Sequence, residues 1–116
     1  MKRRFRLTRS TDFKRVRRSG KSYAHPLVVL YVLKSEAPGV RVGVSAGLAV
    51  GNAVKRNRAK RLLRAAMNDL LPHTVPGSDL MLIARTPLPG SDLASTREAL
   101  SNLLRRAGLL SPSHEI

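Results

Sequence analysis

The chain lacks several residue types on which common activities depend. It contains no cysteine and no tryptophan, only two phenylalanines and two tyrosines, and only seven acidic residues among 116. Without cysteine, disulfide bonds, thiolate nucleophiles and zinc–thiolate sites are excluded. No apolar run approaches the roughly 18 residues of a membrane-spanning helix, and no apolar stretch follows the basic N-terminus as in a secretory signal. We therefore expect a cytoplasmic protein with no membrane partner.

The residues that could catalyse a reaction are scattered along the chain. The seven acids form neither a paired-carboxylate nor a metal-ligand spacing, and the three histidines fall in predicted loops or near the end of the sequence. No serine has the sharp strand–turn–helix setting of a nucleophile. We therefore expect no catalytic residue and no tightly bound metal in the chain itself.

Positive charge is what the chain has in excess. Twenty-two lysines and arginines against seven acids give a net charge of +15, and sixteen of these cations lie in residues 1–21 and 52–64. Such a charge opposes folding by self-repulsion and attracts polyanions over long range. A generally basic, soluble surface would spread the cations evenly, so their clustering favours a nucleic-acid partner.

The second cluster lies at the start of a predicted helix, which is the unfavourable end for cations. The unpaired N–H groups of a helix N-terminus carry roughly half a positive charge. Lys55, Arg56 and Arg58 therefore destabilise this end unless an anion neutralises them. We expect that anion to be RNA.

Hydrophobic patterning predicts one α+β domain over residues 1–116 with the element order α-β-β-α-β-α. The β-branched run 27–33 is a strand without a polar face, 40–45 is a second strand expected to run antiparallel to it, and 79–86 is a third. A β-helix-β segment across residues 40–86 favours parallel pairing, although the sequence does not fix its hand. We expect a sheet with helices mainly on one side.

The first and last helices carry local boundary signals. Ser10 or Thr11 can cap a short first helix, and Gly20 suits a left-handed stop after it. A capping box from Ser95 predicts the start of the last helix, which should end near Gly108.

The middle helix, predicted over 53–71 and ended by Pro72, separates an apolar face from a cationic one. The apolar residues recur at i, i+3, i+4 and i+7: Ala59, Leu62, Leu63, Ala66, Met67 and Leu70. At 100° per residue, the polar residues beside this arc are Asn57, Lys60, Arg61 and Arg64.

Three glycines and two aromatics each allow more than one interpretation. Gly43, Gly47 and Gly51 recur every four residues, which could mean a phosphate cradle or a membrane dimer motif, but tight backbone at a strand–helix crossover fits better. Phe13 and Tyr31 fit a small core. They also fit an open sheet face, where an aromatic beside cations stacks on the bases of single-stranded RNA.

The segment Gly51–Arg64, GNAVKRNRAKRLLR, resembles the "RNR" signature of the bacterial ribonuclease P protein subunit. Flanking segments agree in the same order over about residues 5–107: Asp12-Phe13, Leu30-Tyr31, Arg41–Ser45 and Ile83–Arg85. The resemblance implies an α-β sandwich similar to a ribosomal-protein domain, with a left-handed β-α-β crossover that departs from the usual hand.

The resemblance also implies a function. Subunits of this family bind a catalytic RNA, and that RNA uses Mg²⁺ to remove the 5′ leader of precursor tRNA. The protein contacts the leader and assists metal binding, needs no further protein partner, and leaves Mg²⁺ mainly to RNA oxygens and water.

Three groups of residues follow by position from the resemblance. Those expected on the catalytic RNA are Asn52, Lys55, Arg56, Asn57, Arg58 and Arg61. Those expected to line a cleft for the leader are Phe13, Arg17, Tyr31, Lys60 and Arg64. Those expected to make nonspecific RNA contacts are Lys2, Arg3, Arg4 and Arg6, in a segment 1–9 that, like the tail 109–116, is expected to be flexible.

Two departures from the family pattern and two alternatives remain. Arg17 replaces a second aromatic of the first helix, and Leu48 and Ala49 replace two lysines before the Gly-Asn pair.

A structural ribosomal or assembly protein would also be basic, but it would not stimulate a ribonuclease P RNA at low Mg²⁺. A protein-only nuclease would cleave without any RNA subunit, which the scattered acids disfavour.

Overall fold

A computed structural model describes residues 5–7 and 9–111, and its elements follow in the order α-β-β-β-α-β-α. The helices are α1 (Ser10–Ser19), α2 (Ala53–Leu70) and α3 (Leu93–Arg106). The strands are β1 (Lys21–Ala24), β2 (Val28–Lys34), β3 (Val40–Ser45) and β4 (Ser78–Ala84). Short 3₁₀ turns are η2 (Leu48–Val50), η3 (Leu71–His73) and η4 (Leu88–Gly90). The α+β class is confirmed, with β1 as an additional strand that the sequence pattern did not predict.

The four strands form one mixed sheet in the order β1-β2-β4-β3. β2 pairs antiparallel with β1 and with β4, whereas β3 pairs parallel with β4. The predicted parallel pairing across residues 40–86 is therefore confirmed. The strands β2 and β3 run in opposite directions, as expected, but they are not neighbours because β4 lies between them.

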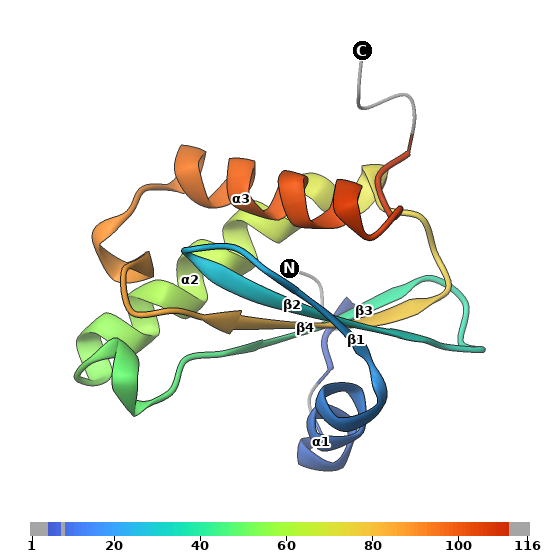
Figure 1. The fold of residues 1–116 in the computed structure, drawn as a ribbon, viewed down its shortest axis with the longest axis horizontal. Coiled ribbons are helices and arrows are strands. Elements are labelled where there is room, and N and C mark those ends of the chain that lie inside the picture. The colour runs from blue at the N-terminus through green and yellow to red at the C-terminus, as the bar shows by residue number, and fades with distance from the viewer. Residues whose placement is uncertain (1–4, 8, 112–116) are drawn as a thin grey trace.

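The helices cover the two faces of the sheet unequally. Figure 1 shows α2 and α3 together on one face and α1 alone on the other. The larger core lies under α2 and α3, where alternate residues of the strands meet the apolar face of α2. That face is buried as predicted at Ala59, Leu63, Ala66, Met67 and Leu70, while Leu62 is only half-buried.

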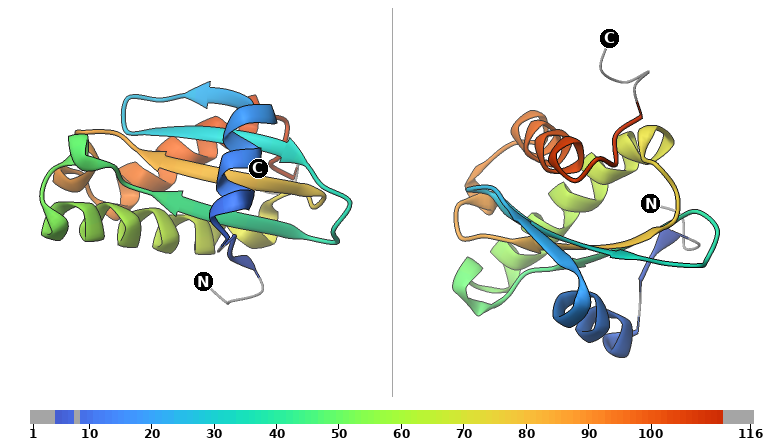
Figure 2. Two further views of the ribbon diagram at one scale, coloured as in Figure 1. Left: turned by 90° about the horizontal axis from the view of Figure 1, so that it is seen from below. Right: turned by 45° about the vertical axis from the view of Figure 1, so that its right-hand side comes forward.

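The β3-α2-β4 crossover is left-handed. Seen from the α1 side in Figure 2 (left), both strands point to the left, β3 lies below β4, and α2 passes behind the sheet. When that view is turned so that the strands point upward, β4 lies to the right of β3 with the crossover behind. This arrangement is opposite to the hand of nearly all such units, and it confirms the expectation from the family resemblance.

A smaller cluster fills the space between α1 and the sheet. Leu7, Val16 and Met81 are buried in it, and Phe13 and Tyr31 pack against it while partly exposed. This face of the sheet is therefore covered, but less completely than the face under α2 and α3.

The boundary signals of α1 differ from those predicted. Its N-cap is Arg9 without a side-chain hydrogen bond, and Gly20 after its end is extended (φ −82°) rather than left-handed. A Cβ on Gly20 would lie 2.5 Å from the carbonyl oxygen of Val16 and 2.8 Å from that of Val32. The glycine is needed because helix and strand backbones approach closely here.

The start of α3 also differs from its prediction. Asp92 is the N-cap, and its Oδ1 accepts the backbone N–H of Ser95 at 2.7 Å. The helix thus begins at Leu93, and the capping box predicted from Ser95 is wrong because a carboxylate three residues earlier already caps the first turn.

Both ends of the described chain contribute to the fold. The N–H of Leu7 donates to the carbonyl of Val42 at 2.8 Å, beside a parallel bridge between Arg6 and Val42. Leu109 and Leu110 are buried against the larger core. Lys2, Arg3 and Arg4 lie outside the described residues.

Candidate RNA-binding surfaces

The first turn of α2 carries its cations without a compensating acid. Asn52 is its N-cap, with Oδ1 accepting the N–H of Lys55 at 3.0 Å, and the turn contains no acid. Gly51 has φ +135°, and a Cβ there would lie 2.7 Å from Cδ of Lys55. The glycine therefore lets the lysine stem pack on the backbone where the chain enters α2.

The charge of residues 55–64 is not neutralised within the described part of the chain. The ion pairs there join Arg15 to Asp12 and Asp79, Arg41 to Asp79, and Arg97 to Asp69. None involves the six cations of α2, which are Lys55, Arg56, Arg58, Lys60, Arg61 and Arg64. The surface of α2 thus keeps the anion-binding capacity that the sequence predicted.

The helical turn distributes these cations over different directions. Lys60 and Arg64 are half-buried toward the edge of the sheet, whereas Asn57 and Arg61 are exposed. Arg58 lies 200° around the helix from Lys60, on the opposite flank. There its Nε donates to the carbonyl of Pro89 at 2.7 Å and its Nη2 to that of Ser91 at 3.2 Å.

Arg56 is half-buried, and its Nε has no hydrogen-bond partner among the described residues. A buried donor left unpaired destabilises a protein by about 1–3 kcal/mol. An acceptor supplied by a bound RNA would relieve this cost.

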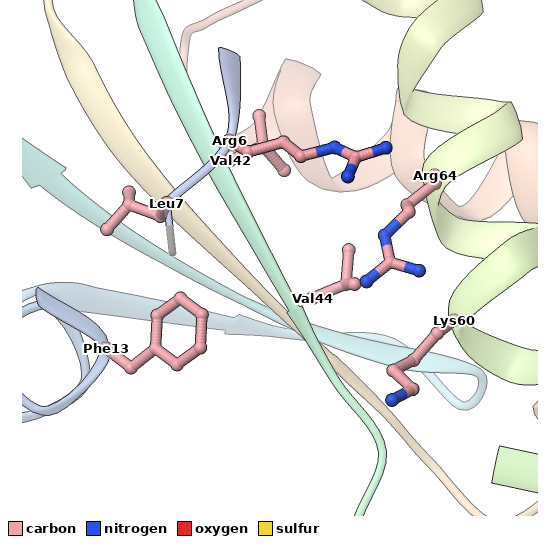
Figure 3. A pocket seen from close by; sticks show the side chains of 7 residues that line it. All are labelled: Arg6, Leu7, Phe13, Val42, Val44, Lys60 and Arg64. Carbon is pink, nitrogen blue, oxygen red and sulfur yellow. The ribbon is translucent and has the colours of Figure 1, made fainter. Parts of the chain in front are cut away.

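A groove of about 310 Å³ runs along the β3 edge of the sheet. Its lining comes from the N-terminal segment, α1, β3 and α2, with the residues Arg6, Leu7, Phe13, Val42, Val44, Lys60 and Arg64. Figure 3 shows Phe13 on one side of β3 and the charged ends of Arg64 and Lys60 on the other. Of the residues predicted for a leader cleft, the groove brings together Phe13, Lys60 and Arg64, and it adds Arg6.

The ring of Phe13 depends on a glycine in β3. A Cβ on Gly43 would lie 2.6 Å from Cε1 of Phe13 and 3.2 Å from the sulfur of Met81. The glycine spacing seen in the sequence therefore has a packing reason at this position: only a bare backbone admits the aromatic ring.

Tyr31 and Arg17 do not line the groove. Tyr31 is level with Met81 and Gly43 across the sheet, but β4 separates its strand from β3. Two strand spacings place it about 10 Å from the position of Gly43. Arg17 is exposed one turn after Phe13 on α1. Both lie on the α1 face of the molecule, beyond the groove.

A buried carboxylate that sequence reasoning missed joins α1 to the sheet. Asp79, with its side chain 1% exposed, accepts hydrogen bonds from Arg15 of α1 at 2.7 Å and from Nε and Nη2 of Arg41 at 3.0 and 2.8 Å. Burial raises the pKa of Asp79, but the hydrogen bonds from the two guanidinium groups outweigh it, so the pKa lies below its ordinary value. The register pair Arg41–Asp79 is visible only once β3 and β4 are known to be neighbours.

Residues 5–7 and 9–111 contain no group of three histidine, aspartate or glutamate side chains placed to hold a metal ion. Within the same residues no helix is long and apolar enough to cross a membrane.

Comparison with known proteins shows the family of the chain. The model of the family described as "Ribonuclease P" matches residues 1–108. The chain belongs to the ribonuclease P protein family. It is 37% identical over 111 residues to the ribonuclease P protein component of Oceanobacillus iheyensis, with 95% of this chain and 92% of the relative covered.

Solved structures of ribonuclease P proteins have the same fold. The Staphylococcus aureus protein superposes with a TM-score of 0.82 at 29% identity, covering 92% of this chain and 98% of that one. The Thermotoga maritima protein gives a TM-score of 0.78 at 30% identity, covering 87% and 96%. The chain is thus a protein subunit of the endoribonuclease ribonuclease P, which acts in tRNA processing with an RNA partner. Family membership decides against the ribosomal or assembly alternative.

Proposed function

We propose that the β3-edge groove binds the 5′ leader of precursor tRNA, while the first turn and outer side of α2 dock on the catalytic RNA. The observation that carries the proposal is the composition of the groove: one aromatic ring and three cations around a strand edge. The two surfaces adjoin on the helix α2, because Asn57 and Arg61 lie only about 20° and 60° around the helix from Arg64.

The groove has the chemistry of a single-strand site. Lys60, Arg64 and Arg6 supply positive charge for successive phosphates, and Phe13 offers part of an aromatic ring to a base. A base can stack on this ring only when it is unpaired, so the groove suits a single strand rather than a duplex. Tyr31 and Arg17 extend the same face, and a leader that continues from the groove across α1 reaches them.

The docking surface has the chemistry of a phosphate-backbone contact. Asn52, Lys55, Asn57 and Arg61 are exposed, and neither Lys55 nor Arg61 forms an ion pair among the described residues. Arg58 is held in place by two carbonyls, which orders its guanidinium before RNA arrives. We assign Mg²⁺ to the RNA, whose phosphate oxygens are the ligands that this ion prefers.

The test is a comparison of precursor and mature tRNA on reconstituted holoenzyme. A Lys60→Ala, Arg64→Ala double variant should bind leader-bearing precursor more weakly and bind mature tRNA as wild type does. Each lost phosphate contact should also reduce the slope of log affinity against log salt by about one. Lys34→Ala removes an exposed lysine that does not line the groove and serves as the matched control.

The proposal fails if the double variant loses affinity equally for precursor and mature tRNA. It also fails if the double variant retains the full preference for precursor.

A further inference from the structure

Apolar side chains are exposed where the chain is most cationic. Among the described residues three large apolar side chains are exposed: Leu48 at 81%, Val54 at 73% and Val75 at 38%. The first two flank the Gly51-Asn52 pair that opens α2, and the third lies beyond the other end of that helix. Single exposed apolar residues are common. The surroundings of Leu48 and Val54 therefore decide whether these two side chains have a role.

Val54 forms part of the wall of a hollow of about 420 Å³. Its apolar lining includes Val50 of η2 and Pro89 of η4, both buried, and its cationic lining is Lys55 and Arg58. In Figure 1 the start of α2, η2 and η4 lie together at one end of the molecule. The volume falls within the roughly 300–1,000 Å³ of small-ligand sites.

The walls of the hollow are tied together. The two hydrogen bonds from Arg58 to the carbonyls of Pro89 and Ser91 join α2 to the η4 turn. The cap from Asn52 fixes the backbone at Lys55. A hollow whose rim is already ordered binds a partner with less loss of conformational freedom.

We infer that this hollow receives one unpaired nucleotide of the catalytic RNA, with its base against Val54 and Pro89 and its phosphate on Lys55 or Arg58. The inference rests on the proposed docking surface. Charge complementarity selects a polyanion, and the apolar wall selects a group with an apolar face. A base offers that face only outside a duplex, because paired bases are stacked. Leu48 stands on the adjacent turn, where it can extend the same contact.

The turn before the Gly51-Asn52 pair carries no charge of its own. It contains Leu48, Ala49 and Val50. An apolar contact there would supply affinity that salt does not screen, whereas lysine contacts weaken steeply as salt rises.

The test measures affinity for the catalytic RNA at several salt concentrations. Val54→Ser should raise the dissociation constant about tenfold, since most of a valine side chain loses its apolar partner. The slope of log affinity against log salt concentration should stay unchanged in Val54→Ser. Arg61→Ala should instead lower the slope by about one. Val75→Ser, an exposed valine away from the hollow, is the matched control and should match wild type.

Base-specific chemical probing supplies a second readout on the same complexes. One unpaired nucleotide should be protected by the wild-type chain and become reactive with Val54→Ser. Wild-type affinity for Val54→Ser, or an equal loss for Val75→Ser, would overturn the inference while Arg61→Ala still supports the docking surface. Self-association of the free chain that Val54→Ser abolishes in sedimentation would overturn it in favour of a second protein copy. If neither Val54→Ser nor Arg61→Ala alters RNA affinity, the proposed docking surface fails as well.

Discussion

Asp79 is the residue on which the position of α1 depends most directly. Its buried carboxylate holds Arg15 from the helix and Arg41 from β3, so it joins three elements at one point. Because Phe13 lies on the same helix as Arg15, this contact also sets one wall of the groove. Removing a charged hydrogen-bond acceptor from such a site destabilises a protein by about 1–3 kcal/mol.

Asp79→Asn should therefore lower the free energy of unfolding at neutral pH. It should also change how that free energy falls as the solution is acidified. The folded pKa lies below the ordinary carboxyl value of about 3.9, so the unfolded chain binds more protons between the two values. The contribution of Asp79 is complete above that ordinary value and is lost as pH falls through the folded pKa. Urea unfolding of both proteins between pH 7 and pH 2 measures this, and their curves should converge at the acid end.

Asp69→Asn is the matched control, because Asp69 also pairs with an arginine but at the surface. The Arg97–Asp69 contact is 3.3 Å long and both side chains are nearly half exposed. Exposed pairs of this kind contribute about 0–1 kcal/mol. Equal destabilisation by the two substitutions would contradict the role given to Asp79.

At the residue scale, the sequence predicted which cations lack an acidic partner, but it did not predict which cations form ion pairs. The uncompensated charge of residues 55–64 followed from the absence of nearby acids. The Asp79 pairs did not, because Arg15 and Arg41 are 64 and 38 residues away along the chain. The sequence left Tyr31 between a core and an open sheet face; it packs in the cluster under α1, and its distance from the groove depends on strand order.

At the scale of elements, α1 and β3 meet through a contact that only glycine allows. Gly43→Ala would place a methyl group 2.6 Å from the Phe13 ring. Either the ring or the helix must move, and such overpacking destabilises a protein by about 1–3 kcal/mol. We expect reduced preference of the holoenzyme for precursor over mature tRNA, with affinity for the catalytic RNA retained.

Gly47→Ala is the control for this substitution. Gly47 has φ −81°, and a Cβ there meets no atom within 4 Å. Thermal unfolding and tRNA affinity should both match wild type. A Gly43→Ala protein indistinguishable from Gly47→Ala would show that the position of Phe13 does not matter for the leader.

Elements with strong periodicity were predicted, and those set by long-range packing were not. The helix α2 followed from its apolar arc, and β2 and β4 followed from their apolar runs. The strand β1 is four residues long and mostly exposed, so it carries no apolar pattern. The caps of α1 and α3 differed because several nearby residues can cap, and packing decides among them. The left hand of the crossover came only from the family resemblance.

At the scale of the whole molecule, we propose that one helix serves two RNA partners. The helix α2 directs Lys60 and Arg64 to the groove and presents Arg61 to solvent, while the rest of the fold keeps these directions fixed. A charge of +15 attracts RNA to any face. The specific claim is that two adjoining groups of side chains on α2 bind different RNAs.

The most direct test measures two quantities on the same variants: affinity for the catalytic RNA, and the ratio of precursor to mature tRNA affinity. For affinity to the catalytic RNA, Arg61→Ala is a cleaner variant than Arg58→Ala, because Arg58 also makes two internal hydrogen bonds. We predict that Arg61→Ala weakens only RNA docking and that the Lys60→Ala, Arg64→Ala double variant lowers only the ratio. Parallel changes of both quantities in both variants would contradict the separation of the two surfaces.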